Sequence, residues 1–517
     1  MHTRLLALVV AFAAVVSGSA EQQQITSSTP GRKVRTNDVP TPGSLGGVRT
    51  QPLPRIDVNT TGLQFPIPQT WAIDPATGAE YRPGEVLVRF KNGANALFRA
   101  RALRAARGRR IARTLPGNWA LIELEPGTST ADSIRAFRSR PEVADASLNF
   151  RRHATQVRPN DEFFPLQWNF DAINLPAAWQ INPGARNDVI VAVVDSGLNT
   201  VTDTFVFSSP LVGQIPVRFA AVPDLVTADR IVAARDFVYD DDFPVDLNGH
   251  GTHVAGTIAQ QTNNSIGVAG VAYNVKLMPL KALVSDWDLV FAAPNNPGGS
   301  VAAVSDAIRH AADNGAKVIN LSLGGEGEAP AERAAIEYAI SRGAFVSIAG
   351  GNSAEDGNPR IFPAAYGTEI NGAMAVGAIA RDLRRAQYSS FHDYVEICAP
   401  GGELSSLFDF DEGVTQVGYE EESTLSFLSP TAKLQALLLG FRPRFDRFEL
   451  RPFEGTSMAA PHISGVAALL YSQGIRNPVA IEEAIERFAR TIEARADECG
   501  AGLVDSRRAL RGLGLAR

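Results

Sequence analysis

The chain has 517 residues, of which 45% are hydrophobic and 20% charged, and its formal net charge is −6. This composition is typical of a soluble globular protein that is long enough for two or three domains. A nucleic-acid-binding function is disfavoured, because an acidic chain repels phosphate.

The first twenty residues combine a basic start, an apolar run at 5–16 and small residues before Glu21. This pattern predicts a secretory signal peptide at 1–20 that is cleaved after Ala20. Twelve apolar residues are too few to span a bilayer, so no stable membrane anchor is expected. The sequence therefore predicts a secreted protein, either extracellular or periplasmic.

Residues 21–78 are rich in Gln, Ser, Thr, Pro and Gly, which predicts a disordered spacer. A small α+β domain is expected at 79–157. Its sequence predicts three strands and two helices, with strands at 84–90, 118–127 and 144–154, and helices at 94–108 and 130–139. This domain carries a net charge of +8 and residues 158–517 carry −16, so the two are expected to attract each other.

From residue 158 onward, near-continuous apolar strands alternate with helices such as 300–315. The strands are predicted in "DVIVAVVDSG", "AKVINLSLGG", "GAFVSIAGGN" and "AMAVGAIA". Buried strands separated by helices predict an α/β domain, a parallel sheet with helices on both faces, over 158–517. Two cysteines, Cys398 and Cys499, either form one disulfide or are two separate buried thiols.

Four polar residues lie where such a sheet places reactive groups. Asp195 ends a buried strand, and sites in open parallel sheets lie at the carboxyl ends of strands. His250 opens a helix after glycine, and Ser457 opens another after Gly-Thr. A serine nucleophile needs a base that is oriented by a third group, and Asp195 and His250 are candidates for these roles. Asn352 ends a further strand, where its amide is a candidate donor to an oxyanion.

Three of these stretches resemble the signatures of the subtilisin-like serine proteases, the subtilases. They are "VVDSG" (193–197), "HGTHVAG" (250–256) and "GTSMAAPH" (455–462), in the family order Asp, His, Ser. The resemblance runs from about Pro159 to the "GAGLVDSRRAL" ending. It implies a secreted endopeptidase that acts on proteins or peptides.

By motif, Asp195 orients the imidazolium, His250 is the general base and then acid, and Ser457 is the nucleophile. Asn352 and the Ser457 N–H resemble the family's oxyanion hole. Pro461 is interpreted as keeping the first turn of the Ser457 helix open.

Two segments resemble those that pair with the substrate backbone on either side. They are Ser322, Leu323 and Gly324, and Ala349, Gly350 and Gly351. Residues 79–157 resemble the family's inhibitory prodomain, which implies an intramolecular inhibitor and self-cleavage between about His153 and Pro159.

Residues 260–270 resemble the family's structural calcium loop. The implied ligands are Asp161, the carbonyls of Thr262, Ile266 and Val268, and the side chain of Asn264. The acidic ligand that the family has soon after the strand of Asp195 is not matched, and Asp203 stands one place away. The cluster 240–246 is interpreted either as a second ion site or as a solvated acidic loop.

Two insertions, at about 203–234 and 402–453, depart from the family pattern, and the second is expected to cover one side of the cleft. Ile361 stands where the family often has glycine at the base of its main specificity pocket, and a branched side chain would shorten that pocket. His253 is expected to be structural. A zinc site at His250 and His253 is disfavoured, because the helix lacks the expected glutamate. The alternative functions are an esterase with the same triad and an inactive peptide-binding scaffold.

Overall fold

The computed structural model describes residues 34–35, 72–74, 80–150, 158–227, 229–291, 299–406 and 409–512. The predicted signal peptide, most of the predicted spacer and residues 153–157 of the expected cleavage window lie outside these ranges. The chain forms two compact units, Asn59–Gln156 and Met1–Val58 with Val157–Arg517. Within the described ranges, no helix has both the length and the apolar character needed to cross a membrane.

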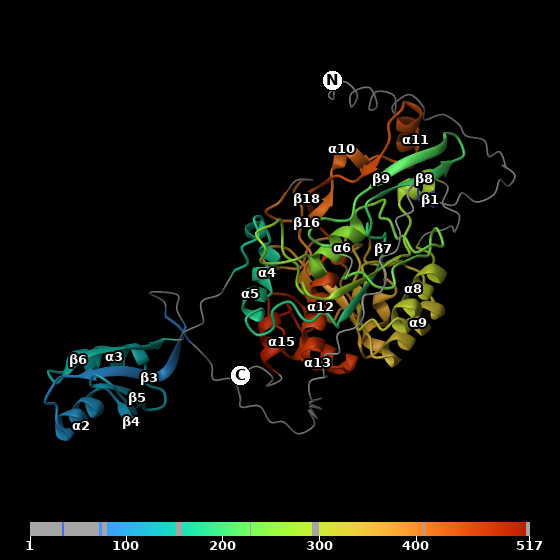
Figure 1. Cartoon of the computed structure of the whole chain (residues 1–517). Coiled ribbons are helices and arrows are strands. Elements are labelled where there is room, and N and C mark those ends of the chain that lie inside the picture. Colours follow the sequence, from blue (N-terminus) through green and yellow to red (C-terminus); the bar gives the residue numbers. More distant parts are fainter. Residues whose placement is uncertain are drawn as a thin grey trace, which may run out of the picture. The chain divides into compact units, whose positions relative to one another are not determined.

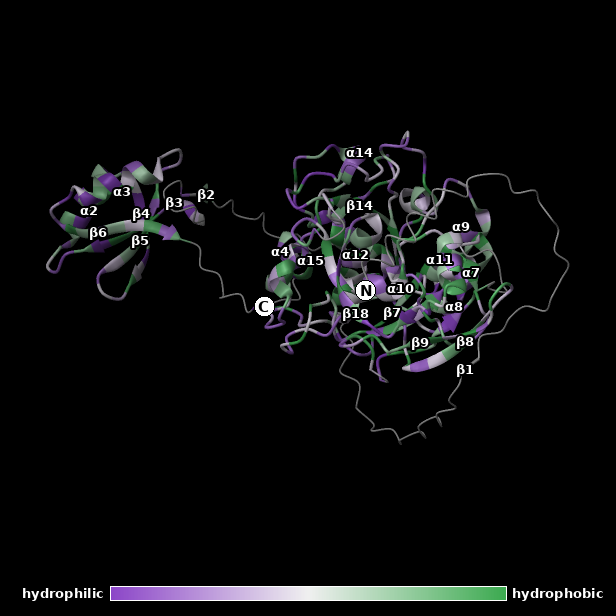
Figure 2. Cartoon of the chain, turned by 90° about the horizontal axis from the view of Figure 1, so that it is seen from above, coloured by the Kyte–Doolittle hydropathy of each residue, from purple (hydrophilic) through white to green (hydrophobic). Residues whose placement is uncertain are grey.

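The smaller unit is a five-stranded antiparallel sheet with two helices, of which the sequence predicted three strands and both helices (Figure 1). Its elements are β2 (Ala72–Ile73), β3 (Glu80–Phe90), α2 (Ala96–Ala105), β4 (Gly108–Leu115), β5 (Trp119–Leu124), α3 (Thr130–Arg138) and β6 (Val143–Phe150). The core joins the buried face of the sheet to α2 and α3, and α3 carries hydrophobic and hydrophilic residues on different sides (Figure 2). Strand β4 was not predicted from the sequence. None of its residues is buried, so it lacks the alternation that marks a strand.

The larger unit is built on a seven-stranded parallel sheet with the order β10-β11-β7-β12-β13-β14-β15. These strands are β7 (Ile190–Asp195), β10 (Arg235–Asp236), β11 (Lys276–Lys281), β12 (Val318–Leu321), β13 (Phe345–Ala349), β14 (Ala373–Ile379) and β15 (Ile397–Pro400). The helices are η1 (Phe164–Leu166), α4 (Trp168–Ala172), α5 (Leu175–Ala178), α6 (His250–Ala259), α7 (Asp286–Val290), α8 (Val301–Asp313), α9 (Pro330–Ser341), η2 (Ala364–Glu369), α12 (Thr456–Ser472), α13 (Pro478–Arg487), α14 (Ala496–Cys499) and α15 (Ser506–Gly512).

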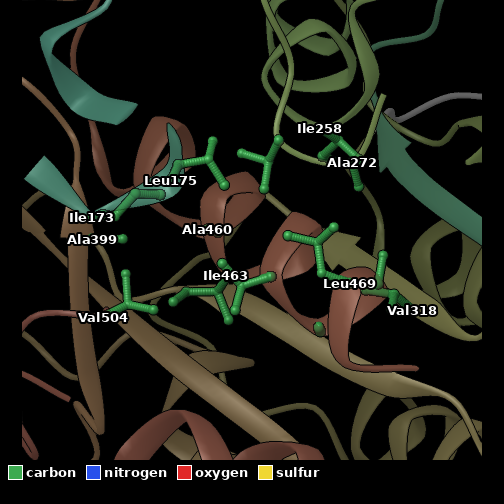
Figure 3. Packing of buried hydrophobic residues seen from close by; sticks show 14 of the residues in the cluster. Ile173, Leu175, Ile258, Ala272, Val318, Ala399, Ala460, Ile463, Leu469 and Val504 are labelled. Carbon is green, nitrogen blue, oxygen red and sulfur yellow. The ribbon is translucent and has the colours of Figure 1, made fainter. Parts of the chain in front are cut away.

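Helices cover both faces of this sheet, which confirms the predicted α/β class. Alternate residues of β7 point to opposite sides. Val191 and Val193 belong to the core with α6 and α12, whereas Ala192 and Val194 belong to the core with α8 and α9. Helix α12 is apolar all round and is buried among the other elements (Figures 1 and 3).

The two insertions fold together into an accessory layer with its own core. Strands β8 (Asp203–Ser209), β9 (Gly213–Phe219) and β17 (Arg444–Phe445) form a sheet that β1 (Val34–Arg35) extends along β8. Strands β16 (Val414–Tyr419) and β18 (Phe448–Phe453) form an antiparallel pair. Between them in the chain lie α10 (Glu421–Thr424), α11 (Pro430–Leu438) and β17. β1 and β2 lie within 21–78, for which the sequence predicts no regular structure.

Cys398 and Cys499 form a disulfide with a sequence separation of 101 residues, which answers the question that the sequence left open. The bond joins β15, at the edge of the parallel sheet, to α14.

Candidate active site

Asp195 lies at the carboxyl end of β7 and is fully buried. Its Oδ1 accepts a hydrogen bond from the Ser196 N–H at 2.6 Å and lies 2.7 Å from Nδ1 of His250. A carboxylate accepts from Nδ1–H, which leaves Nε2 of His250 as the basic nitrogen. The structure therefore brings the first two predicted residues into direct contact.

His250 is the first residue of α6, and a fixed turn precedes it. Gly249 has a φ of 102°, which disfavours any residue with a side chain. The helix start packs so closely on the turn after β7 that a Cβ on Gly251 would lie 2.3 Å from the Gly197 carbonyl oxygen. Helix α6 therefore holds His250 against Asp195 through backbone contact.

Asp246 fixes the same helix start through its buried carboxylate. One oxygen accepts from the N–H of Gly249 at 2.9 Å and the hydroxyl of Ser196 at 3.0 Å. The other accepts from the N–H and the hydroxyl of Thr252 at 3.0 and 2.7 Å. An acceptor at a helix N-terminus satisfies donors that have no partner in the helix, so Asp246 caps α6 and ties it to the residue after Asp195.

The charges around His250 set its proton affinity. Burial alone lowers the pKa of His250, but the charge and hydrogen bond of Asp195 and the charge of Asp246 outweigh that effect and raise the pKa above its ordinary value. A base must be unprotonated to act, so its function is lost as the pH falls through this raised pKa.

Ser457 lies in the first turn of α12, which runs unbroken through Pro461. The proline does not open the turn, contrary to the interpretation from the sequence. Pro461 has no N–H to offer the Ser457 carbonyl, and the hydroxyl of Ser322 donates to that carbonyl instead at 2.8 Å. Asn320 in turn donates to the Ser322 hydroxyl at 2.9 Å. Because of the proline, the Ser457 carbonyl has no partner within the helix and accepts from Ser322, which follows β12.

Asn352 follows β13, and its amide has a defined orientation. Oδ1 accepts from both the N–H and the hydroxyl of Thr456, at 2.9 and 2.8 Å. Only the oxygen end can accept two donors, so the NH₂ end points elsewhere. Nδ2 lies 3.3 Å from where a Cβ on Gly455 would sit, beside the start of α12.

The hydroxyl of Ser457 donates to the Ser322 carbonyl oxygen at 3.4 Å. No hydrogen bond between Ser457 and His250 occurs in the described part of the chain, although α6 and α12 pack on each other. Hydrogen bonds in an active site are often long or missing until substrate binds.

The two predicted substrate segments differ in their backbone groups. At Leu323 and Gly324, no peptide group has a hydrogen-bond partner among the described residues, so both are available for an added strand. By contrast, the N–H groups of Gly350 and Gly351 already donate to the Val376 carbonyl and to the Thr456 hydroxyl. The N–H groups of Gly350 and Gly351 are therefore not free to pair with a substrate backbone in the way that the sequence predicted. We interpret the 349–351 segment as a side wall of the substrate site.

The residues predicted for calcium lie together with an additional carboxylate. Buried Asp161 accepts from the N–H groups of Asn263 and Asn264, at 2.7 and 3.2 Å. Asn264 donates to Asp224 at 2.6 Å. Burial raises the pKa of Asp224, and the charge of Asp161 adds to this effect against the hydrogen bonds of Asn264 and Gln260. The negative charges of the two carboxylates repel each other, and the loop beside them is rich in oxygen atoms. This set of ligands suits a hard divalent cation.

Asp224 belongs to the first insertion and was not found from the sequence, which noted only that Asp203 stands one place away from the family's acidic ligand. Asp203 instead starts β8 in the accessory layer. The predicted carbonyl donors Thr262, Ile266 and Val268 lie on the loop after α6.

The acidic cluster 240–246 has other partners than an ion. Asp240 and Asp242 pair with Arg235 and are exposed, while Asp246 caps α6. His253 and His462 are structural: His253 lies 2.9 Å from the Val414 carbonyl through Nε2, and His462 lies 2.8 Å from the Met458 carbonyl through Nδ1. Burial lowers the pKa of His253 to about 3 and of His462 to about 4, so both are neutral.

Comparison with known proteins finds two family matches. Residues 186–502 match the model described as the subtilase family, and residues 68–149 match the fervidolysin N-terminal prodomain. A thermophilic serine proteinase of Bacillus sp. (strain AK1) is 32% identical over 418 residues, which cover 80% of this chain and 83% of that protein. Thermitase of Thermoactinomyces vulgaris is 31% identical over 354 residues, 68% of this chain and 99% of thermitase. Among solved structures, a protease of Pseudoalteromonas arctica superposes with a TM-score of 0.53 at 28% identity, over 69% of this chain and 100% of that one.

Proposed function

Because the chain belongs to the subtilase family of serine endopeptidases, we propose that Asp195, His250 and Ser457 are its catalytic triad. The observation that carries this assignment is the 2.7 Å contact between Asp195 Oδ1 and His250 Nδ1. It leaves Nε2 of His250 as the group that can take a proton from Ser457.

In the proposed reaction, Ser457 Oγ attacks the carbonyl carbon of the substrate while His250 Nε2 takes its proton. Asp195 stabilises the imidazolium that results. His250 then gives the proton to the leaving amine, and the acyl group stays on Ser457. Water attacks the acyl group with the same base, and the acid leaves with Ser457 regenerated.

Negative charge develops on the carbonyl oxygen during both attacks. Nδ2 of Asn352 and the N–H of Ser457, at the positive end of α12, are the donors that we assign to it. The orientation of Asn352 supports this role, because Thr456 engages Oδ1 and leaves the NH₂ group to donate. The substrate backbone adds as a strand beside Leu323 and Gly324.

The protein is made, in this proposal, as a secreted precursor that processes itself. Residues 79–157 act as an intramolecular inhibitor, and their charge of +8 against the −16 of residues 158–517 favours binding that weakens as salt rises. The disulfide supports export, since such bonds persist in oxidising compartments. Calcium is the cation that we assign to Asp161, Asp224 and the 262–268 loop, where it would neutralise the two carboxylates.

The test is to express wild type beside Ser457→Ala and to assay both on casein. Wild type is expected to cleave casein and to yield a shorter chain with its N-terminus between His153 and Pro159. The variant is expected to be folded, inactive and still joined to its prodomain. Cleavage of small esters but not casein would favour an esterase, and casein cleavage by the variant would overturn the assignment of Ser457.

A further inference from the structure

We propose that Ile361 closes the space beside Ser457 that would receive the substrate side chain before the cleaved bond. The enzyme would then cut after small residues and reject aromatic ones. This inference rests on the proposed function and names its substrate class.

Two backbone segments border that space, and both are attached to the start of α12. On one side, the carbonyl of Ser322 accepts from the Ser457 hydroxyl at 3.4 Å, and Gly324 follows two residues later. On the other side, the N–H of Gly351 donates to the hydroxyl of Thr456 at 3.1 Å. In this proposal, the substrate side chain that enters next to Ser457 lies between Gly324 and Gly351.

Ile361 fills the gap between these two glycines. A Cβ built on Gly324 would lie 2.6 Å from Cγ2 of Ile361, and a Cβ built on Gly351 would lie 2.6 Å from its Cγ1. One side chain thus contacts both walls so closely that neither has room for a methyl group. Ile361 is only 6% exposed, so it is a packed part of this structure.

Neighbouring bonds hold Ile361 in place from both sides. Phe362 exchanges two backbone hydrogen bonds with Gly325, at 2.7 and 2.8 Å. The hydroxyl of Tyr394 accepts from the Ile361 N–H at 3.3 Å and donates to the Gly350 carbonyl at 3.2 Å. Since the backbone at Ile361 is linked to each wall, it cannot move away without breaking these hydrogen bonds.

A small side chain such as alanine needs little depth, whereas a phenyl ring needs the volume that Ile361 occupies. Close-packed interiors tolerate little added volume, so a large side chain would lift the substrate carbonyl away from Ser457. We expect kcat/KM to be roughly 100-fold lower after Phe than after Ala.

The chain's own expected cleavage window supplies a second, independent substrate. Between Arg152 and Pro159, the residue with the smallest side chain is Ala154. Cleavage after a small residue therefore selects the bond between Ala154 and Thr155.

The test uses the self-processed protein and peptide nitroanilides that differ only in the last residue, Ala or Phe. Wild type is expected to prefer Ala, and its mature N-terminus is expected to be Thr155. Ile361→Ala should raise the ratio of kcat/KM for Phe over Ala by roughly 10-fold or more, because it removes the methyl groups that close the space.

A matched control is Ile370→Ala. Ile370 is 7% exposed, against 6% for Ile361, and packs in the core of the α8–α9 side, so the same atoms are lost away from Ser457. This variant should keep the wild-type ratio. If Ile361→Ala does not fold, the wild-type preference alone decides.

Wild type that cleaves after Phe as fast as after Ala, through Ser457, would overturn this inference and leave the proposed function standing. An equal rise of the ratio in both variants would overturn it too. Absence of any cleavage that depends on Ser457 would overturn the proposed function itself.

Discussion

Two groups of buried carboxylates in the larger unit have opposite surroundings. At the carboxyl end of β7, Asp195, Asp246 and Asp288 are fully buried, and each accepts hydrogen bonds. Buried Lys281 lies 3.1 Å from Asp288 and donates to the Ser196 carbonyl at 2.9 Å. A buried cation and the N-terminus of α6 thus face these charges.

Near the far edge of the same sheet, Glu396, Glu482 and Glu486 lie with oxygens within 4.8 Å of one another. Glu396 accepts from the Ala375 N–H and Glu482 from the Gly372 N–H, and the two carboxyl groups share a hydrogen bond. Burial raises the pKa of Glu396 to about 9 and of Glu482 to about 7, and their mutual charges add to the rise for Glu396.

The difference shows how a protein keeps or loses buried charge. Where hydrogen-bond donors and a cation converge, they offset the cost of burying a carboxylate, and Asp195 is in contact with a histidine. Where carboxylates meet without a cation, they bind protons instead. The same residue type is therefore a candidate for chemistry in one place and a source of pH dependence in the other.

The largest effect is expected from a substitution that removes the charge of Asp195 but keeps the shape of its side chain. Asp195→Asn should lower kcat by roughly 10⁴, because the amide neither stabilises the imidazolium nor keeps its tautomer. The measurement is kcat on a peptide nitroanilide, with thermal unfolding as a check of the fold. Exposed Asp188, which pairs with Arg186, provides the control Asp188→Asn. Activity within tenfold of wild type would show that catalysis does not need the charge of Asp195.

A third group of carboxylates, Asp161 and Asp224, sharpens the comparison, because the cation that we propose for it would bind directly to the carboxylates. A chelator is expected to lower the melting temperature of the mature enzyme by roughly 5–10 °C, since an ion held only by the folded state stabilises it by about 3 kcal/mol when well above its Kd. Asp224→Asn should lose most of that shift. An unchanged melting temperature, with no metal detected by elemental analysis, would remove calcium from the proposal.

The smallest effect concerns the glutamate group and is a matter of pH. In the unfolded chain, Glu482 loses its proton above about pH 4.5. In the folded chain its pKa is raised to about 7, so it keeps the proton up to about that pH. Unfolding then releases protons, so the free energy of unfolding falls as the pH rises across that window. Glu482→Gln should flatten the fall and gain about 1–3 kcal/mol at pH 8 relative to pH 5.

Urea unfolding at both pH values measures this difference. Glu493→Gln, an exposed position outside the glutamate group, is the control and should follow wild type. Parallel curves for wild type and Glu482→Gln would mean that Glu482 is ionised in the folded state.

The sequence was sufficient for features that short patterns encode. Apolar strands, the residue that ends β7 and the helix starts at His250 and Ser457 follow from neighbouring residues. It was insufficient where a residue's partner lies far along the chain. Asp246 and Asp224 look like ordinary loop acids until folding places them beside α6 and Asn264. The disulfide and the accessory core depend in the same way on contacts across long separations.

The disulfide has a consequence for a protease that can be cleaved by other molecules of the same enzyme. Residues 398–499 form a covalent ring that contains the second insertion and Ser457. A cut at any one bond of the ring, for example in the exposed turn after α11, opens it without releasing a fragment. The two pieces of a nicked molecule would therefore stay covalently joined until a reductant is added.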